Sequence, residues 1–404
     1  MDHPLLPRLA ARSAASPPTA LAADEPFWDD VRGLYDLDAS FTQLNYGFYH
    51  PSLTPVFEAE LATARELNRR ASHFKRFDAP ALAESARAAV ADLVGAEADE
   101  IVVTRSASEA LNLVLSGLPF ESGDEVVCSD RDYTAAEQAL GERGRFDGVR
   151  VVRVSLPAEP TDDEVVRAFE AALTPRTKLL LVTQVIHVTG QILPAAELCA
   201  LARRHGVPVL VDAAHALGQL EVDVRALDCD YLAAALHKWV GAPLGTGVLY
   251  VRRDRIAGVR PLFGDTAFAD TDVRKLERFG NRTEAVFSGL LEALKWHRAL
   301  GWRLKAERLA LLRRRWTEPL RALPGVTVLS SREHCAGLSL FAVKGWNAPE
   351  LVDALYREFG LHTAVQTLPS GPGVRVVPGF PSRLEHLDGL VEAVRQLSAR
   401  GQQS

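Results

Sequence analysis

Short apolar runs alternate with amphipathic segments through the middle of the chain. The run Val207–Val211 is continuously apolar, which is typical of a strand buried on both faces of a parallel sheet. Helices are predicted at Thr161–Leu173 and Pro194–His205. Strand and helix alternate at roughly thirty-residue spacing, the pattern of a parallel sheet with crossover helices. The predicted strands are Glu100–Thr104, Glu125–Ser129, Val149–Val154, Lys178–Val185, Val207–Val211 and Tyr231–Leu236.

A different pattern follows Val251. Glu284–Leu320 predicts two helices, and the rest of the chain predicts strands at Val326–Val343 and Val374–Val377 with a helix at Pro349–Phe359 between them. The sequence therefore predicts an α/β fold with a mainly parallel sheet flanked by helices, plus a smaller α+β C-terminal domain. We expect residues 56–295 to form the large domain and residues 296–404 the small one.

The N-terminal part is harder to interpret. Residues 1–25 are rich in Ala, Pro and Ser, and they predict a flexible arm without a secretion signal. Residues 26–55 are expected to pack near the active site. Helical periodicity predicts helices at Phe27–Tyr35, Val56–Asn68 and Pro80–Val94, whereas Ser72–Phe77 is predicted to be an ordered loop.

Composition and charge restrict the possible partners. The hydrophobic fraction of 47% and the charged fraction of 24% are ordinary for a globular protein. A net charge of −6 argues against nucleic acid as the main partner. No apolar run approaches the length of a membrane span. The four cysteines lack the spacing of a disulfide framework or a metal motif, which favours reduced thiols and a cytoplasmic location.

Asp212 and Lys238 each follow an apolar strand, and the carboxyl ends of such strands are where an open α/β sheet places its chemistry. A carboxylate and a lysine in one cleft suit pyridoxal phosphate, because the amine can form a Schiff base while the acid keeps the ring nitrogen protonated. Taken singly, Asp212 could be a helix cap and Lys238 a surface residue. A metal site built from Asp212, His215 and His237 is a weaker alternative that leaves Lys238 without a role.

The segments DAAH (residues 212–215), HKW (237–239) and GAPLGTGVLYV (241–251) resemble the class V aminotransferase family of fold-type I pyridoxal-phosphate enzymes. The most similar branch is the isopenicillin-N epimerase-like and cysteine-desulfurase-like one. The resemblance extends from about Phe27 to about Gln396. It implies the cofactor pyridoxal 5'-phosphate, an amino-acid-like small-molecule substrate, and a homodimer with shared active sites.

The resemblance also assigns residues to the cofactor. It implies that Lys238 bears the cofactor, that Asp212 contacts the ring nitrogen, and that Tyr133 stacks on the ring. Ser106 and Glu109 have the spacing of a capping box, and the helix that they begin would offer its N-terminal N–H groups to an anion. The residues implied to bind the cofactor are Ala107, Ser108, Tyr133, Asp212, His215, His237 and Lys238, with Gly280 and Asn281 reaching the cofactor of the neighbouring subunit.

Other positions are implied to contact the substrate. Arg375 matches an arginine that holds the substrate carboxylate, and Asn45, Tyr46 and Phe48 lie in a segment that enters the active site. His187 stands where the family commonly has asparagine, and it could move a proton near neutral pH. For Tyr133 the alternative is a core tyrosine, and for Asn45, Tyr46 and Phe48 a buried loop held by aromatic packing.

The resemblance implies that a desulfurase would carry a mobile cysteine shortly before Arg375. That stretch contains no cysteine, and Cys335 lies far upstream as an expected core thiol, so a desulfurase is disfavoured. The leading hypothesis is an isopenicillin-N epimerase-like enzyme that acts at the substrate Cα. Its catalytic residues would be Lys238, Asp212 and His187. A class V aminotransferase and a C–S or β-lyase use the same residues and stay as alternatives, and a non-catalytic pyridoxal-phosphate protein is a further one.

Overall fold

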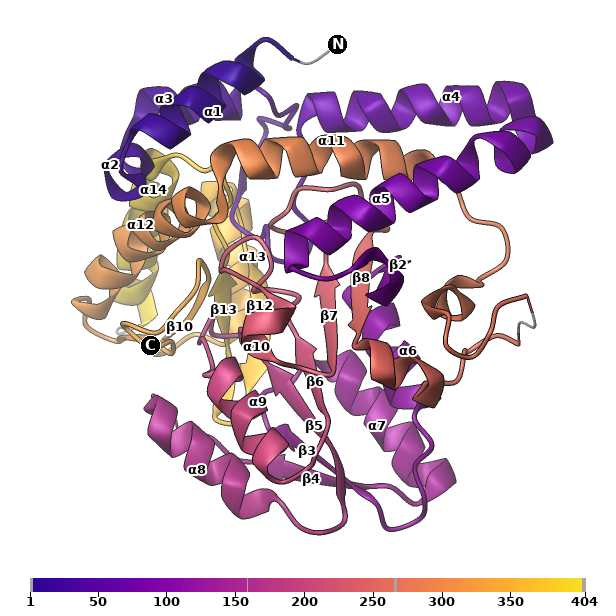
Figure 1. The fold of residues 1–404 in the computed structure, drawn as a ribbon. Helices are drawn as coiled ribbons and strands as arrows, with labels where there is room; N and C mark the ends of the chain where they lie inside the picture. The colour runs from indigo at the N-terminus through magenta and orange to yellow at the C-terminus, as the bar shows by residue number, and fades with distance from the viewer. Residues whose placement is uncertain (1–2, 158, 265–266, 402–404) are drawn as a thin grey trace.

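The computed structural model describes residues 3–157, 159–264 and 267–401. Its centre is a seven-stranded sheet with the order β2-β8-β7-β6-β5-β3-β4, in which only β8 runs antiparallel to its neighbours (Figure 1). This confirms the predicted mainly parallel sheet. The strands are β2 Ile101–Thr104, β3 Glu125–Ser129, β4 Arg150–Val154, β5 Thr177–Thr183, β6 Val209–Asp212, β7 Tyr231–Ala235 and β8 Gly247–Val251.

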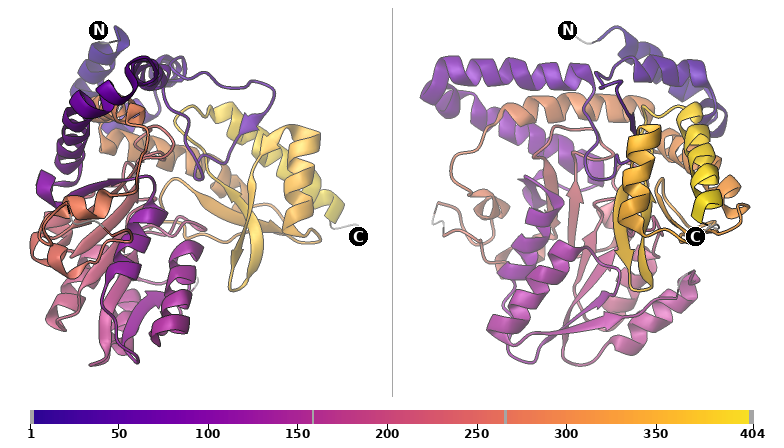
Figure 2. Two further views of the ribbon diagram at one scale, coloured as in Figure 1. Left: turned by 90° about the vertical axis from the view of Figure 1, so that its right-hand side faces the viewer. Right: turned by 180° about the vertical axis from the view of Figure 1, so that it is seen from behind.

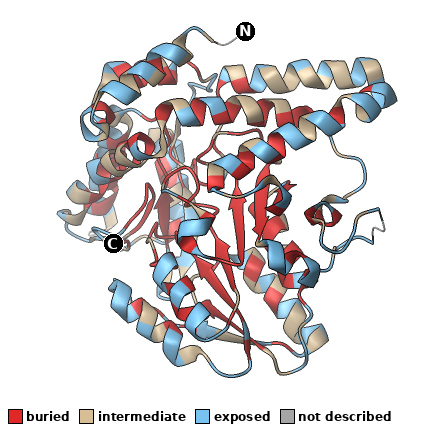
Figure 3. Cartoon of the chain, viewed as in Figure 1, coloured by how far each residue is buried: buried red, intermediate tan, exposed pale blue. Residues whose placement is uncertain are grey.

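The central strands are apolar throughout because both sheet faces are covered. On β5, Leu180 and Val182 belong to one buried cluster, and Leu179 and Leu181 belong to the other. Helices α6 and α7 pack against one face, whereas α5, α8, α9 and α11 pack against the other. Figure 3 shows the strands buried and the outer faces of these helices exposed. The helices are α5 Ala79–Val94, α6 Ala107–Gly117, α7 Thr134–Asp147, α8 Asp162–Ala172, α9 Ala195–Arg204, α10 Val224–Leu227 and α11 Ala285–Leu300.

The C-terminal part contains a second, antiparallel sheet with the order β12-β13-β10-β9 (Figure 2). Helix α11 continues through the expected domain boundary at residue 295, and the break before α12 falls at Gly301, whose φ of 76° suits glycine. The elements are α12 Trp302–Arg321, β9 Val326–Val328, β10 Ser339–Val343, α13 Ala348–Phe359, β11 Leu361–His362, β12 Ala364–Leu368, β13 Gly371–Val376 and α14 Leu384–Gly401.

The expectation of a flexible arm over residues 1–25 is wrong for the residues that the structure describes. Two helices form there, α1 Leu5–Ala15 and α2 Pro18–Ala22, and a third, α3 Glu25–Arg32, begins at the end of this segment. Leu9 and Leu21 are buried, because α1 packs against α11 and α2 packs against α12. Composition suggested disorder because these residues include few apolar side chains. The side chains are buried against helices that are distant in the sequence, and a local pattern does not reveal such partners.

A second correction concerns Ser72–Phe77, which is helical rather than a loop. It forms the end of α4 Thr54–Phe77, after a break at Ala71, whose φ is 47°. The segment after α3 contains β1 Thr42–Gln43, which pairs in parallel with β11. Residues 42–45 are thereby joined to the C-terminal part, since Asn45 also forms a bridge with Val377.

Candidate active site

A cavity of about 420 Å³ opens where β5, β6 and β7 end. The carboxyl ends of these parallel strands meet at one edge of the sheet, which places Thr183, Asp212 and the turn after β7 side by side. Segments from the N-terminal and C-terminal parts close the cavity from outside. Its lining residues are Gly47, Phe48, Ser106, Ala107, Ser108, Tyr133, Thr134, Thr183, Val185, His187, Asp212, Ala214, His215, Ala235, His237, Lys238, Leu244, Gln366 and Arg375.

Lys238 extends into the cavity from the turn that follows β7. Its Nζ lies 3.0 Å from Nε2 of His215. Burial lowers the pKa of Lys238 to about 8, against an attraction to the carboxylate of Asp212 that raises it, and the nearby Arg375 lowers it further. A substantial fraction of this amine is therefore neutral near physiological pH, as a nucleophilic or basic lysine must be.

Asp212 is the last residue of β6 and is buried. Its Oδ1 accepts a hydrogen bond of 2.8 Å from the Ala214 N–H, which fixes the orientation of the carboxyl group. Burial raises the pKa of Asp212, whereas this hydrogen bond and the charge of Lys238 lower it. A buried carboxylate in this position is suited to a cationic N–H group inside the cavity.

Two histidines flank these residues. His237 Nδ1 lies 2.8 Å from the carbonyl oxygen of Thr246, which can only accept, so Nδ1 carries the proton. His215 Nδ1 is buried and has no hydrogen-bond partner among the described residues. Burial lowers the pKa of both histidines, which keeps them neutral. The unpartnered nitrogen of His215 leaves a polar atom that a bound group would satisfy.

The N-terminus of α6 contributes backbone donors to the cavity. Ser106 caps this helix, because its Oγ accepts a hydrogen bond of 3.1 Å from the Glu109 N–H. The second half of the predicted capping box is absent, since Glu109 accepts from the N–H of Arg105 instead. Ala107 and Ser108 line the cavity at the first helical positions, where N–H groups lack intrahelical partners. Such a helix end binds anions.

Arg375 reaches the cavity from β13 in the C-terminal part. Its Nη1 donates to the carbonyl oxygen of His187 at 2.9 Å, and its Nη2 donates to Oδ1 of Asn45 at 3.1 Å. Its buried Nε has no partner among the described residues. Burial lowers the pKa of Arg375 to about 10, so the guanidinium stays charged at neutral pH. An oriented guanidinium with unused donors suits a carboxylate.

Tyr133 and His187 form the side of the cavity between β3 and β5. Their rings meet edge to face, with centroids 5.4 Å apart. Tyr133 is 37% exposed, so it is not a core tyrosine. His187 Nδ1 has no partner among the described residues. Burial lowers the pKa of His187 to about 3, with added repulsion from Arg375 and Lys238.

Some predicted site residues do not line the cavity. Tyr46 is buried beside His50, with ring centroids 5.1 Å apart, and lines a separate cavity with Tyr35 and Tyr49. Its neighbours Gly47 and Phe48 line the active-site cavity instead. Asn45 does not line the cavity, but its Oδ1 accepts a hydrogen bond from Arg375, which does. Gly280 and Asn281 are exposed on a loop outside the cavity of their own chain.

Sequence reasoning missed a pair of polar residues beside the cavity. Asp132 is buried and accepts hydrogen bonds from the Ser129 N–H and the Thr183 hydroxyl. Burial raises the pKa of Asp132 to about 7, and repulsion from Asp212 adds to this. The position of Thr183 at the end of an apolar strand was a usable signal. Gln366 and Leu244 also line the cavity. Gln366 lies in a segment whose pattern gave no signal, and Leu244 lies in the segment 241–251, whose resemblance to the family did not single it out.

Comparisons with known proteins agree with this geometry. The model of the family described as aminotransferase class-V matches residues 56–367. The chain belongs to the class V aminotransferase family. Isopenicillin N epimerase of Streptomyces clavuligerus is 31% identical over 395 residues, covering 92% of this chain and 98% of that protein. A cysteine desulfurase of Synechococcus elongatus is 31% identical over 331 residues, covering 76% of this chain and 51% of that protein.

Solved structures show the same fold. The cysteine desulfurase of Thermococcus onnurineus has a TM-score of 0.83 at 25% identity, covering 92% of this chain and 98% of that one. The cystine C–S lyase C-DES, solved with its product cysteine persulfide, has a TM-score of 0.80 at 23% identity, covering 88% of this chain and 98% of that one. The class V chain is therefore a fold-type I pyridoxal-phosphate enzyme, as predicted.

The residues present fit this cofactor. The donors at the start of α6 match a phosphate, the buried carboxylate of Asp212 matches a protonated ring nitrogen, and Lys238 supplies the amine. The unpartnered Nδ1 of His215 is a further polar atom for the cofactor to satisfy. Among the described residues no cluster of three metal-ligating side chains occurs, and no helix is long and apolar enough to span a membrane.

Proposed function

We propose that the protein moves a proton at the Cα of an amino acid or an amino-acid-derived substrate, as an isopenicillin-N epimerase-like enzyme. The observation that carries this proposal is the position of Lys238, a lysine with a lowered pKa that faces the cavity between Asp212 and Arg375. Pyridoxal phosphate, when bound, supplies a conjugated ring that takes up the electron pair left when the Cα proton departs.

Each residue of the chain has a separate task. The neutral amine of Lys238 takes the proton from Cα on its own side and returns it there. Asp212, held by the Ala214 N–H, keeps a proton on the ring nitrogen. Arg375, oriented by Asn45 and the His187 carbonyl, binds the substrate carboxylate with its remaining N–H groups.

We assign the proton transfer on the other face of Cα to His187. Arg375 is one of the charges that lower the pKa of His187, and a bound carboxylate would neutralise this repulsion. Burial is the larger cause of the lowered pKa, so substrate binding would raise the pKa of His187 only in part, in the direction that favours proton exchange by the imidazole. Tyr133, whose ring contacts His187, is the alternative proton carrier for this face.

The same geometry disfavours desulfuration. No cysteine is among the residues that line the described cavity. Cys335 is buried, and its Sγ donates to the carbonyl oxygen of Thr189 at 3.2 Å. Burial raises the pKa of this thiol, which keeps it protonated and unreactive.

Incubation of the holoenzyme with a panel of amino acids in heavy water tests the proposal. We expect deuterium at Cα with the amino group retained, accompanied by loss of stereochemical purity, for the preferred substrate. A keto acid formed with transfer of the amino group would replace the proposal with a transaminase, and a product lacking the β-substituent would replace it with a lyase.

We further propose a cytoplasmic homodimer in which Gly280 and Asn281 complete the phosphate site of the partner subunit. Their exposure outside the cavity of their own chain supports this assignment. Mixing Lys238→Ala and Asn281→Asp chains tests it, because mixed dimers would contain one site free of both changes. Recovery of activity on mixing is expected, and its absence with two folded variants that do exchange subunits would refute a shared site.

A further inference from the structure

The turn that carries Lys238 is held by three hydrogen bonds to its carbonyl groups. The carbonyl oxygen of His237 accepts from the His50 N–H at 3.2 Å, and that of Lys238 accepts from the Gly241 N–H at 3.1 Å. The carbonyl oxygen of Trp239 accepts from Nζ of Lys305. Two of these donors come from outside the central sheet, one from the N-terminal segment and one from α12.

Lys305 is buried, with 2% of its surface exposed. Besides the Trp239 carbonyl, its Nζ contacts Nδ1 of His297 at 2.9 Å and lies 4.8 Å from the ring centroid of Phe380. Burial lowers the pKa of Lys305 to about 7, and no charged group of the described chain offsets this effect. An amine buried without a carboxylate costs folding free energy, so its presence needs a local explanation.

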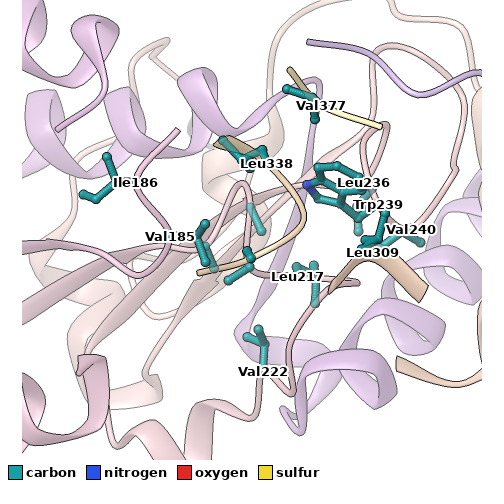
Figure 4. Packing of buried hydrophobic residues seen from close by; sticks show 14 of the residues in the cluster. Val185, Ile186, Leu217, Val222, Leu236, Trp239, Val240, Leu309, Leu338 and Val377 are labelled. Atoms are coloured by element: carbon teal, nitrogen blue, oxygen red, sulfur yellow. The ribbon is translucent and has the colours of Figure 1, made fainter. Parts of the chain in front are cut away.

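The surroundings of Trp239 leave the turn little freedom. Its side chain is fully buried and belongs to the same apolar cluster as Val240 and Leu309 of α12 (Figure 4). A Cβ placed on Gly218 would lie 2.7 Å from the carbonyl carbon of Trp239, so the backbones of these two residues approach closely. The Lys305 amine therefore bonds to a carbonyl that packing has already confined.

We propose that Lys305 is a positioning residue for Lys238: its hydrogen bond to the Trp239 carbonyl fixes the peptide group after Trp239, the residue next to Lys238, and thereby the place of the Lys238 amine in the cavity. The bond also has a second consequence. Helix α12 packs against β9 in the sheet that carries Arg375, so Lys305 couples the substrate-carboxylate side of the site to the turn that bears Lys238.

The experiment compares Lys305→Met with Arg308→Met. Methionine has nearly the length of lysine but cannot donate. Arg308 is the control, because it lies one turn further along α12, is fully buried, and donates to the carbonyl oxygens of Ala22 and Ser382 and to the carboxylate of Glu25 without contacting the Lys238 turn. Both variants lose a buried cation and its hydrogen bonds, but only Lys305→Met releases the Trp239 carbonyl.

We expect Lys305→Met to lower kcat about tenfold to a hundredfold, as misplacement of a catalytic group does, with KM nearly unchanged. The visible absorbance of the chromophore that pyridoxal phosphate forms on Lys238 should titrate with a midpoint shifted upwards by about half a pH unit or more, because a looser turn admits water to the amine. Arg308→Met should change thermal stability but neither kcat nor this midpoint.

Equal chromophore midpoints and equal kcat in wild type and Lys305→Met would overturn the proposal and leave Lys305 a structural residue. If Lys305→Met does not fold, His297→Leu replaces it, since this change removes one contact of the Lys305 amine and should lower kcat in the same direction by a smaller factor. No change in the His297→Leu enzyme would equally overturn it. The chromophore forms on Lys238 whatever reaction the enzyme catalyses, so this test stands if the reaction is not proton exchange.

Discussion

The cavity has two walls that are held in different ways. The sheet wall consists of Thr183, Asp212 and Lys238, which are placed by neighbouring parallel strands and the turn after β7. The outer wall consists of Gly47, Phe48, Gln366 and Arg375, which come from opposite ends of the chain. Asn45 and Arg375, joined by one hydrogen bond, lie 330 residues apart in the sequence.

This difference separates chemistry from selection of the substrate. The sheet wall provides Asp212 and Lys238, to which we assign the chemistry at Cα, and strand register holds them. The outer wall provides Arg375, which we propose binds the substrate carboxylate, and the exposed Phe48, and contacts between distant segments hold this wall. We expect changes to the sheet wall to abolish the chemistry and changes to the outer wall to alter substrate binding.

The largest expected effect is that of Lys238→Ala. Turnover and the protein-linked chromophore should both disappear, because no other described lysine lines the cavity. Visible spectra and the heavy-water assay measure these two losses. Lys178→Ala, which removes an exposed lysine on β5, is the control and should leave both unchanged. A chromophore that persists in Lys238→Ala would disprove the assignment of this wall.

The next largest effect is expected for Arg375→Met in the outer wall. Loss of the proposed contact with the substrate carboxylate should raise KM about a hundredfold, with a smaller fall in kcat and an intact chromophore. Steady-state kinetics measure the two parameters separately. Arg313→Met removes a buried arginine that, among the described residues, donates to the carbonyl oxygens of Ser331 and Arg332 outside the cavity, and it should leave KM unchanged. Loss of the chromophore in Arg375→Met would contradict the assignment of the chemistry to the sheet wall and of substrate binding to the outer wall.

His187 stands between the two walls, and His187→Asn sharpens the comparison. We expect inversion at Cα to fall about a hundredfold, while deuterium exchange with retention falls less than about tenfold, because Lys238 still serves its own face. Chiral chromatography with mass spectrometry distinguishes the two products. Equal loss of both would show that His187 supports binding rather than proton transfer on one face.

The smallest expected effect is on stability rather than on activity. It is a pH dependence of the free energy of unfolding that arises from Lys305, which lies behind the sheet wall. The pKa of Lys305 is about 7 in the folded chain and near its ordinary value of 10.5 when unfolded, so the unfolded chain binds more protons between these values. Stability should therefore rise with pH by roughly 2–3 kcal/mol between about pH 7 and about pH 9 relative to Lys305→Met. Urea unfolding at both pH values measures this, and a constant difference would contradict a buried, unpaired amine.

Much of the sheet wall could be predicted from the sequence. The apolar runs before Asp212 and Lys238 predicted their strands, and parallel topology then required their ends to meet. The spacing of Ser106 and Glu109 predicted the cap of α6, although Glu109 bonds to Arg105 rather than completing the box. Arg375 could be placed in the site only through family resemblance, because no local pattern relates it to Asn45.

The sequence by itself determined the order of strands and helices, and with it the lysine and carboxylate at one edge of the sheet. Local periodicity carries that information, because a strand buried on both faces must be apolar along its whole length. Tertiary structure decided which way Tyr46 faces, whether residues 3–25 are ordered, and that Lys305 supports the turn of Lys238. These depend on contacts between segments distant in the chain, whose free energy appears only when the partners are assembled.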